Sequence, residues 1–273
     1  MSTYIRYPNY GGRFGFYPDN PSMLKNFIES VTDLPNKQIE GKGVIVPHAG
    51  YPYSGKTLYK TLKALKTFPE TIIIIGPNHS GLGQDVAMIS EGSWQIMGKS
   101  IQINSGLAKS IQQVSRIVQN DYTSHQKEHS IEVILPLLLS IQPEFRLVPI
   151  IMRNYHPSVV EDISQAIIFS FQTQSSTPLV IASSDMSHYV SQIEAKRKDE
   201  IAFQAIRHLD GKQLLSSVQQ EHISMCGSGP VAVAMNIAKS QGATQATLID
   251  YTDSSEETKD TSEVVSYAGF IFH

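Results

Sequence analysis

The 273-residue sequence predicts an α/β fold, in which helices flank a largely parallel, mixed central sheet. Glycine and proline residues divide the chain into short apolar runs that alternate with segments of helical period, as in proteins built from strand–helix–strand units. The apolar runs are almost entirely aliphatic and rich in β-branched residues, which is typical of strands covered on both faces. The chain has no internal repeat, long linker or low-complexity tract, so residues 1–273 are predicted to form a single domain.

Four apolar runs are expected at the centre of the sheet. They are Gly43–Val46, Thr71–Ile75, Leu147–Ile151 and Leu179–Ala182. Pro149 lacks the N–H group of a sheet ladder, so its strand is predicted to lie at an edge or to contain a bulge. Two terminal strands are predicted at residues 247–251 and 264–272. The acidic segment 253–260 between them is expected to be a solvated loop.

Apolar residues at helical spacing predict the helices between these strands. Ser54, Asn104 and Pro157 are suitable residues to begin three of them. The residues expected on the buried faces are, in chain order, Leu58, Leu62 and Leu65, then Leu107, Ile111, Val114 and Val118, then Val160, Ile163, Ile167 and Phe171. Two more helices are predicted at residues 195–209 and 230–239.

The composition excludes several classes of protein. Twenty-two Lys and Arg against 25 Asp and Glu give a net charge of −3, which argues against binding to nucleic acid. The single cysteine, Cys226, cannot form an intrachain disulfide, so a secreted disulfide framework is excluded. The amino terminus has no signal-peptide pattern, and no apolar run approaches the roughly 20 residues that cross a bilayer. We therefore predict a cytoplasmic protein that does not enter a membrane.

Three of the predicted strands end in histidine motifs. The motifs are Pro47-His48-Ala49-Gly50-Tyr51, Gly76-Pro77-Asn78-His79 and Ser183-Ser184-Asp185-Met186-Ser187-His188-Tyr189. In open α/β sheets, ligands bind beyond the carboxyl ends of the strands. Neighbouring parallel strands lie roughly 4.8 Å apart, so imidazoles that follow them can reach one shared metal ion. Any one of these histidines taken alone would also fit a structural role near a turn.

Two other segments offer metal ligands. In Glu128-His129-Ser130-Ile131-Glu132, the i, i+3 spacing would place His129 and Glu132 on one helix face, as ligands or as partners of ligands. The same segment also fits an ordinary helix start with acidic residues at the positive end of the helix dipole. Cys226 lies in a glycine-rich turn ahead of a helix, a position that lowers a thiol pKa and favours a thiolate ligand, although a buried inert cysteine is the alternative.

Residues 50–57, GYPYSGKT, satisfy the pattern of a phosphate-binding loop. That loop requires consecutive backbone N–H groups around the phosphate, and Pro52 has none, while Tyr51 and Tyr53 crowd the segment. Nucleotide hydrolysis is therefore not expected.

Taken together, these motifs resemble the Memo family, which includes the proteins called AmmeMemoRadiSam system protein B. The resemblance rests on PHAGYPYSG, GPNH, EHSIE followed by LPLL, SSDMSHY and MCGSGP, which occur in family order over about 180 residues from Pro47 to Pro230. It implies a fold similar to that of class III extradiol dioxygenases. The Lys56-Thr57 pair of the phosphate-loop pattern merely follows the family motif.

The resemblance also implies functional residues. His48, His79 and Cys226 match the family positions that bind metal, His188 matches the acid–base histidine of the dioxygenases, and Asp185 matches a residue of the same cleft. The family's association with AMMECR-type and radical SAM proteins implies these as partners, beside a small-molecule or peptide ligand in the metal cleft.

These residues predict a metal-dependent redox or oxygenase-type protein of unknown substrate. Two imidazoles and a thiolate leave open coordination positions for iron or copper, with zinc as a further candidate. His188 would move protons, and Asp185 would orient His188 or a bound water. Two alternatives remain open: a non-catalytic module that uses a vestigial cleft to recognise a (phospho)peptide or protein, and a metallohydrolase.

Overall fold

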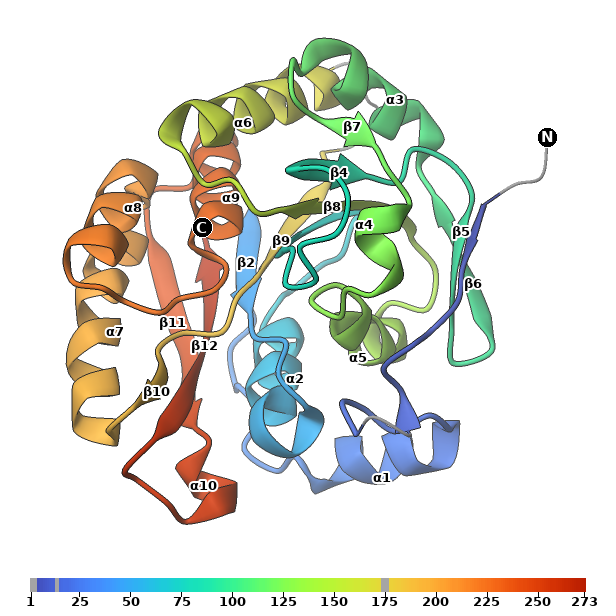
Figure 1. The fold of residues 1–273 in the computed structure, drawn as a ribbon. Coiled ribbons are helices and arrows are strands. Elements are labelled where there is room, and N and C mark those ends of the chain that lie inside the picture. The colour runs from blue at the N-terminus through green and yellow to red at the C-terminus, as the bar shows by residue number, and fades with distance from the viewer. Residues whose placement is uncertain (1–3, 13–14, 173–176) are drawn as a thin grey trace.

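The structure, a computed structural model, describes residues 4–12, 15–172 and 177–273. The described strands form one twelve-stranded mixed sheet, whose main order is β1-β5-β6-β8-β3-β9-β2-β12-β10, with β11 beside β12 and β4 joining β8 to β7 (Figure 1). The strands are β1 (Ile5–Arg6), β2 (Gly43–Val46), β3 (Thr71–Pro77), β4 (Val86–Met88), β5 (Ser93–Ile96), β6 (Lys99–Ile103), β7 (Gln119–Asn120), β8 (Arg146–Met152), β9 (Leu179–Ser183), β10 (His188–Val190), β11 (Ala246–Asp253) and β12 (Val264–Phe272).

Helices cover both faces of this sheet (Figure 1). They are α1 (Pro21–Ser30), α2 (Lys56–Lys63), α3 (Ser105–Val114), α4 (Thr123–Gln126), α5 (Leu135–Ile141), α6 (Pro157–Phe171), α7 (Gln192–Arg207), α8 (Gly211–Gln220), α9 (Ser228–Ser240) and α10 (Ser255–Thr258), with a π-helical turn at Tyr51–Gly55 and a 3-10 turn at Glu132–Ile134. On one face α9 packs against β2, β3 and β9, with α6 and α8 beside it. On the other face α2 packs against β2, β11 and β12, and beside α5.

The four strands predicted at the centre of the sheet are neighbours in the order β8-β3-β9-β2. Their aliphatic side chains are fully buried because helices cover them from both sides. The terminal strands β11 and β12 are also as predicted, and they pair antiparallel. The α/β prediction with a largely parallel, mixed sheet is confirmed. Within the described part of the chain, no helix is both long and apolar enough to cross a bilayer.

The prediction for Pro149 was wrong, because its strand β8 lies inside the sheet. Pro149 pairs with Ile74 of β3 on one side. On the other side, β6 pairs with Arg146 and Leu147, whereas β4 pairs with residues 150–152. Pro149 falls in the gap between these two partner strands, where no ladder hydrogen bond is required of it.

Three local predictions also need correction. The Asn104 side chain caps α3 by accepting from the N–H of Leu107, but Ser54 caps no helix and instead donates to the carbonyl of Ala49. Helix α3 ends at Val114, so Val118 is buried from a loop and not from a helix face. The acidic segment between β11 and β12 contains the one-turn helix α10, and its first residue, Asp253, is buried.

Candidate metal centre

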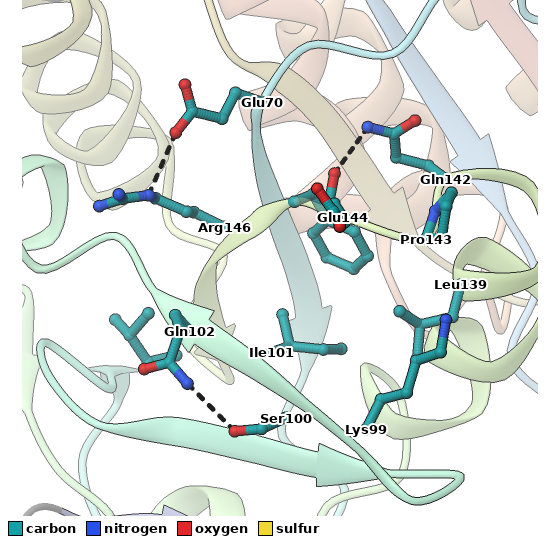
Figure 2. Close-up of a pocket in the computed structure, with 12 residues that line it drawn as sticks. Glu70, Lys99, Ser100, Ile101, Gln102, Leu139, Gln142, Pro143, Glu144 and Arg146 are labelled. Atoms are coloured by element: carbon teal, nitrogen blue, oxygen red, sulfur yellow. Dashed lines mark hydrogen bonds and ion pairs between the residues drawn. The ribbon is translucent and has the colours of Figure 1, made fainter.

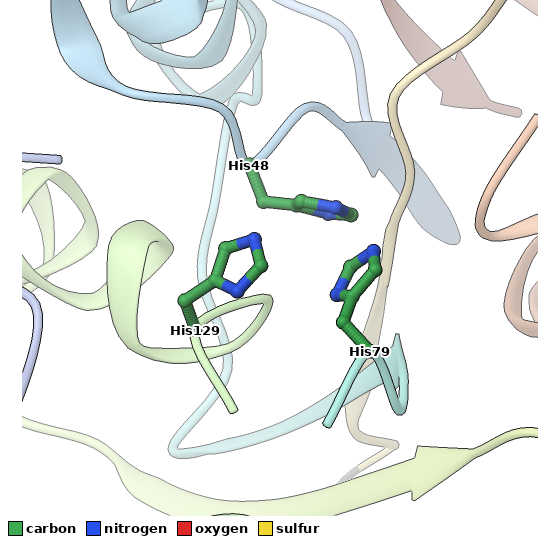
Figure 3. A group of neighbouring side chains, drawn as sticks. All are labelled: His48, His79 and His129. Carbon is green, nitrogen blue, oxygen red and sulfur yellow. The ribbon is translucent and has the colours of Figure 1, made fainter. Parts of the chain in front are cut away.

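Three imidazoles meet beyond the carboxyl ends of the central strands. His48, His79 and His129 each offer a ring nitrogen, and these atoms all lie within 4.8 Å of one another. The rings face a common point (Figure 3), with centroid separations of 5.1 Å for His48–His79, 5.4 Å for His48–His129 and 4.7 Å for His79–His129. His48 is buried, His129 is partly buried and His79 is exposed, so the group is open to solvent on the side of His79.

The sheet brings the first two histidines together. Strands β2 and β3 are both parallel to β9, which lies between them, so their carboxyl ends reach the same edge. His48 lies two residues beyond β2 and His79 two residues beyond β3. His129 arrives from elsewhere in the chain, on the segment between α4 and the 3-10 turn that precedes α5.

Hydrogen bonds define the tautomer of His48. Its Nδ1 lies 2.7 Å from Oγ of Ser183, the last residue of β9. The Ser183 hydroxyl donates its own proton to the carbonyl of Ser130 at 2.6 Å, so it can only accept from His48. Nδ1 of His48 therefore carries the proton, and Nε2 keeps the lone pair that a metal needs.

The carboxylate of Glu128 plays the same role for His79. Nδ1 of His79 lies 3.0 Å from Oε1 of Glu128, so in the neutral ring Nε2 of His79 carries the lone pair. The carboxylate also accepts from the backbone N–H groups of His79, His129 and Ser130. Burial by itself raises the pKa of Glu128, but the hydrogen bond and charge of His79 and the charge of His129 lower it to about 2. Glu128 is thus an anion at neutral pH.

His48 and His129 are held in the neutral form. Burial lowers the pKa of His48 well below its usual range, and the neighbouring imidazoles lower it further. Burial also lowers the pKa of His129 against the opposing charge of Glu128. Phe16 and Tyr10 pack on the His129 ring, with centroids at 4.8 and 5.5 Å. Neutral imidazoles are the form that binds metal, so no proton has to leave these rings first.

Cys226 lies beside this group rather than within it. Its Sγ lies 3.4 Å from Nε2 of His48 and accepts from the N–H of Asp185 at 3.2 Å. Burial raises the pKa of the thiol well above its ordinary value, and the Asp185 carboxylate raises it further. The prediction that the start of α9 lowers the pKa of the Cys226 thiol is therefore wrong, because desolvation and a nearby carboxyl group outweigh the effect of the helix end.

Asp185 contacts His48, and His188 follows Asp185 by three positions in the chain. Asp185 accepts from the backbone N–H of His48 at 2.8 Å, and its other carboxylate oxygen lies 3.8 Å from Nε2 of His48. Burial raises the pKa of Asp185. Nδ1 of His188 donates to the carbonyl of Met186 at 2.8 Å, so in the neutral ring Nε2 is the nitrogen that carries the lone pair.

Glu132 does not share a helix face with His129, because the first helical turn begins only at Glu132 itself. Its carboxylate is fully buried and pairs with Arg6 of β1 at 2.8 Å. It also accepts from the N–H groups of Asn9 and Tyr10 and from the hydroxyl of Tyr17 at 2.6 Å. Glu132 thus ties the amino-terminal segment, including the aromatic wall beside His129, to the core.

Sequence reasoning missed Glu128 and Ser183 as partners of the histidines. Both lie inside the histidine motifs described above: Glu128 directly precedes His129, and Ser183 lies two residues before Asp185. An acidic residue adjacent to a candidate ligand was the available signal for Glu128. Ser183 carried no comparable signal, because only its pairing opposite Val46 of β2 places its hydroxyl beside His48.

A cavity of about 1060 Å³ lies at the opposite edge of the sheet (Figure 2). It is lined by Glu70 and Arg146, which form an ion pair at the start of β3 and β8, and by residues of β6 and the segment after α5. It lies at the amino ends of β3 and β8, whereas ligands of such sheets bind at the carboxyl ends of the strands.

Residues 51–55 of the phosphate-loop pattern form a π-helical turn and not a loop, with Tyr51 buried.

Comparison with known proteins identifies relatives over almost the whole chain. The family described as "Memo-like protein" matches residues 6–271. A "MEMO1 family protein" from Methanopyrus kandleri is 35% identical over 271 residues, covering 94% of this chain and 95% of the relative. Proteins of the same description from Aquifex aeolicus and Nitrosopumilus maritimus are each 35% identical and cover 98% of this chain and 99% of their own length.

Proposed function

Because this chain belongs to the family of Memo-like proteins, and because its imidazoles converge, we propose that it is a metal-dependent protein of redox or oxygenase type. The observation that carries the proposal is the group of His48, His79 and His129, whose ligand atoms lie within 4.8 Å of one another. Three imidazoles from separate segments suit iron, copper or zinc. When bound, such a metal would supply Lewis acidity and, for iron or copper, electron exchange.

We consider two sets of ligands, of which the first is the convergent group of imidazoles and the second follows from the family resemblance. His48 and His79 belong to both sets, and the third ligand is either His129 or Cys226. Cys226 would have to lose its proton on binding, which the raised pKa of its thiol opposes until a metal is present. A set of three imidazoles also suits iron(II), whereas a set that includes a thiolate favours copper(I) or zinc.

The surrounding residues have roles that follow from their hydrogen bonds. Ser183 and Glu128 orient His48 and His79 through their Nδ1 atoms. His188 has its Nε2 free to accept a proton from a ligand in the cleft, because Nδ1 is committed to a carbonyl group. Asp185 lies between His48 and Cys226 and would orient a water or the His188 ring.

A purely anion-binding module is less well supported. The centre contains the ionised carboxylate of Glu128, which would repel a phosphate group. A metallohydrolase could use the same ligands, but its metal would activate a bound water molecule without exchanging electrons. A small-molecule or peptide ligand and the AMMECR-type and radical SAM partners remain predictions from the family resemblance, as does cytoplasmic location.

Metal analysis of single variants tests the proposal. The protein is purified anaerobically, loaded in turn with iron(II), copper(I) and zinc, and its retained metal is measured for the wild type, His48→Ala, His79→Ala, His129→Ala and Cys226→Ser. His208→Ala, which changes an exposed histidine at the end of α7, is the matched control. Loss of metal in the His48 and His79 variants supports the centre. Of His129→Ala and Cys226→Ser, the variant that retains less metal identifies the third ligand. Retention of metal by the His48 and His79 variants would refute it.

Turnover separates the remaining alternatives. Oxygen consumption with a panel of reduced organic substrates, lost in His188→Ala while metal is retained, supports the redox function. Hydrolysis of ester or amide substrates without oxygen consumption would instead favour the hydrolase.

A further inference from the structure

Asp199 of α7 carries a buried carboxylate that the proposed function does not use. The residue is fully buried, and within the described part of the chain no lysine, arginine or histidine forms an ion pair with it. Burying a carboxyl group without a cation is costly, and desolvation raises its pKa against the hydrogen bonds that it accepts.

The hydrogen bonds of Asp199 converge on the segment that carries His188. Oδ1 accepts from both the N–H and the hydroxyl of Ser187, at 3.1 and 2.6 Å. Oδ2 accepts from the hydroxyl of Tyr251 on β11 at 2.8 Å and from that of Ser266 on β12 at 2.5 Å. A single carboxylate thus joins α7, β11 and β12 to the residue directly before His188.

The same segment is bound from its other side. Ser266 donates its N–H to the carbonyl of Ser187 at 2.9 Å, and its carbonyl accepts from the N–H of Met186 at 2.8 Å. The carbonyl of Met186 in turn accepts from Nδ1 of His188. The tautomer of His188 therefore depends on where the Met186 carbonyl points, and the backbone on both sides of that carbonyl is anchored by Asp199 or by its partner Ser266.

Backbone strain at the next residue supports this interpretation independently. Tyr189 has φ of 56°, a left-handed conformation that is rare for a bulky residue, and its side chain is 75% exposed. The pairing of β10 with β12 is irregular between His188 and Val190, so Tyr189 occupies a bulge. Strained backbone persists only where the surrounding structure determines it, and bulges commonly redirect a side chain beside a functional site.

We propose that Asp199 is a positioning residue, whose buried carboxylate fixes Ser187 and thereby holds His188 with Nδ1 protonated and Nε2 free. The proposal rests on the proposed function for the role that it gives His188. A carboxyl group without a cation and a strained tyrosine both destabilise the fold, and both act on the three-residue segment 187–189. The shared consequence is a single defined orientation of one imidazole at the edge of the metal centre.

The test measures the His188 ring directly in the metal-free full-length protein. Two-bond ¹H–¹⁵N NMR spectra distinguish a protonated nitrogen from a bare one, and His188→Gln assigns the signals. At a pH at which the ring is neutral, we expect Nδ1 protonated and Nε2 bare in the wild type. In Asp199→Asn, whose amide cannot accept all four hydrogen bonds, we expect the two nitrogen shifts to move toward each other as both tautomers become populated.

Matched variants separate positioning from general destabilisation. Asp253→Asn also removes a buried carboxylate, but one that binds Gln192 and Ser255 and not Ser187. It is expected to leave the His188 shifts unchanged. Tyr251→Phe removes one donor from Asp199 and keeps the ring. It is expected to move the His188 shifts in the same direction as Asp199→Asn by a smaller amount, and it carries the test if Asp199→Asn does not fold.

Unchanged His188 shifts in a folded Asp199→Asn protein would overturn the proposal, as would equal shifts in Asp253→Asn. If Asp199→Asn does not fold, unchanged shifts in Tyr251→Phe would overturn it. Because the spectra are recorded without metal, this outcome is separate from the metal analysis: His188 can be positioned by Asp199 even if the centre binds no metal. Metal retention by Asp199→Asn is expected to equal that of the wild type.

Discussion

Nδ1 of His79 donates to Oε1 of Glu128 at 3.0 Å, and the same carboxylate accepts from the backbone N–H of His129. One anion therefore orients the imidazole of His79 and also anchors the backbone of His129. Removing this charge tests whether the arrangement is built for metal.

Glu128→Gln is expected to weaken metal binding without removing a ligand. The amide is uncharged and a poorer acceptor, so His79 loses its fixed tautomer and part of its basicity. Loss of such a partner typically costs about 10- to 100-fold in metal affinity. Competition with a chromophoric chelator measures the affinity. Glu70→Gln, an exposed residue at the opposite edge of the sheet, is the control, and equal affinities in the two variants would contradict the role of Glu128.

Glu132→Ala is expected to destabilise the fold strongly, because it leaves the guanidinium of Arg6 buried without a counter-ion. Breaking a buried ion pair from one side costs about 3–5 kcal/mol. Urea unfolding measures the loss. Glu91→Ala, which breaks an exposed pair with Lys109, is expected to cost about 0–1 kcal/mol. Similar losses in both variants would show that Glu132 does not anchor the amino-terminal segment.

Gly227→Ala is expected to displace the loop that carries Cys226. A Cβ atom at this position would lie 2.3 Å from the carbonyl oxygen of Ser183, which the strand β9 holds in place. Overpacking of this kind costs about 1–3 kcal/mol in stability. Thermal unfolding monitored by circular dichroism measures it. In Gly106→Ala the nearest atom lies at 3.7 Å, so that variant should be neutral or slightly stabilising, and the prediction fails if the two behave alike.

His125 is expected to make stability depend on pH. Burial, together with the charge of Arg6, lowers its pKa in the folded protein from 6.5 to about 4. As the pH falls below 6.5, the unfolded chain binds a proton that the folded protein does not, so the free energy of unfolding falls until about pH 4. The total loss is on the order of 3 kcal/mol.

Urea unfolding at several pH values measures this dependence. His125→Leu removes the titrating group from the same buried site, so its stability should vary less between pH 6.5 and 4, whatever its absolute value. His208→Leu, an exposed histidine, should keep the wild-type dependence. An unchanged slope in His125→Leu would rule out His125 as its source.

The sequence by itself determined the sheet and part of the site. Runs such as Thr71–Ile75 and Leu179–Ala182 are so aliphatic that only burial on both faces accommodates them, and they form adjacent central strands. Because parallel strands end at one edge, the positions of His48 and His79 after two such strands were enough to bring them together. The position of each histidine directly after a strand can be read from the sequence alone.

Only the tertiary structure decided which groups complete the centre. His129 and its neighbour Glu128 reach it from a separate segment, which the hydroxyl of Ser130 joins to the end of β3 through the carbonyl of Pro77. No local sequence pattern reports the burial of these side chains. Burial raises the pKa of Cys226 and the pKa of Asp199, which has no cation beside it. Pro149 lies within the sheet because β4 and β6 leave a gap beside it. Each of these outcomes depends on contacts between residues distant in sequence, whose solvent exposure and partners exist only in the folded chain.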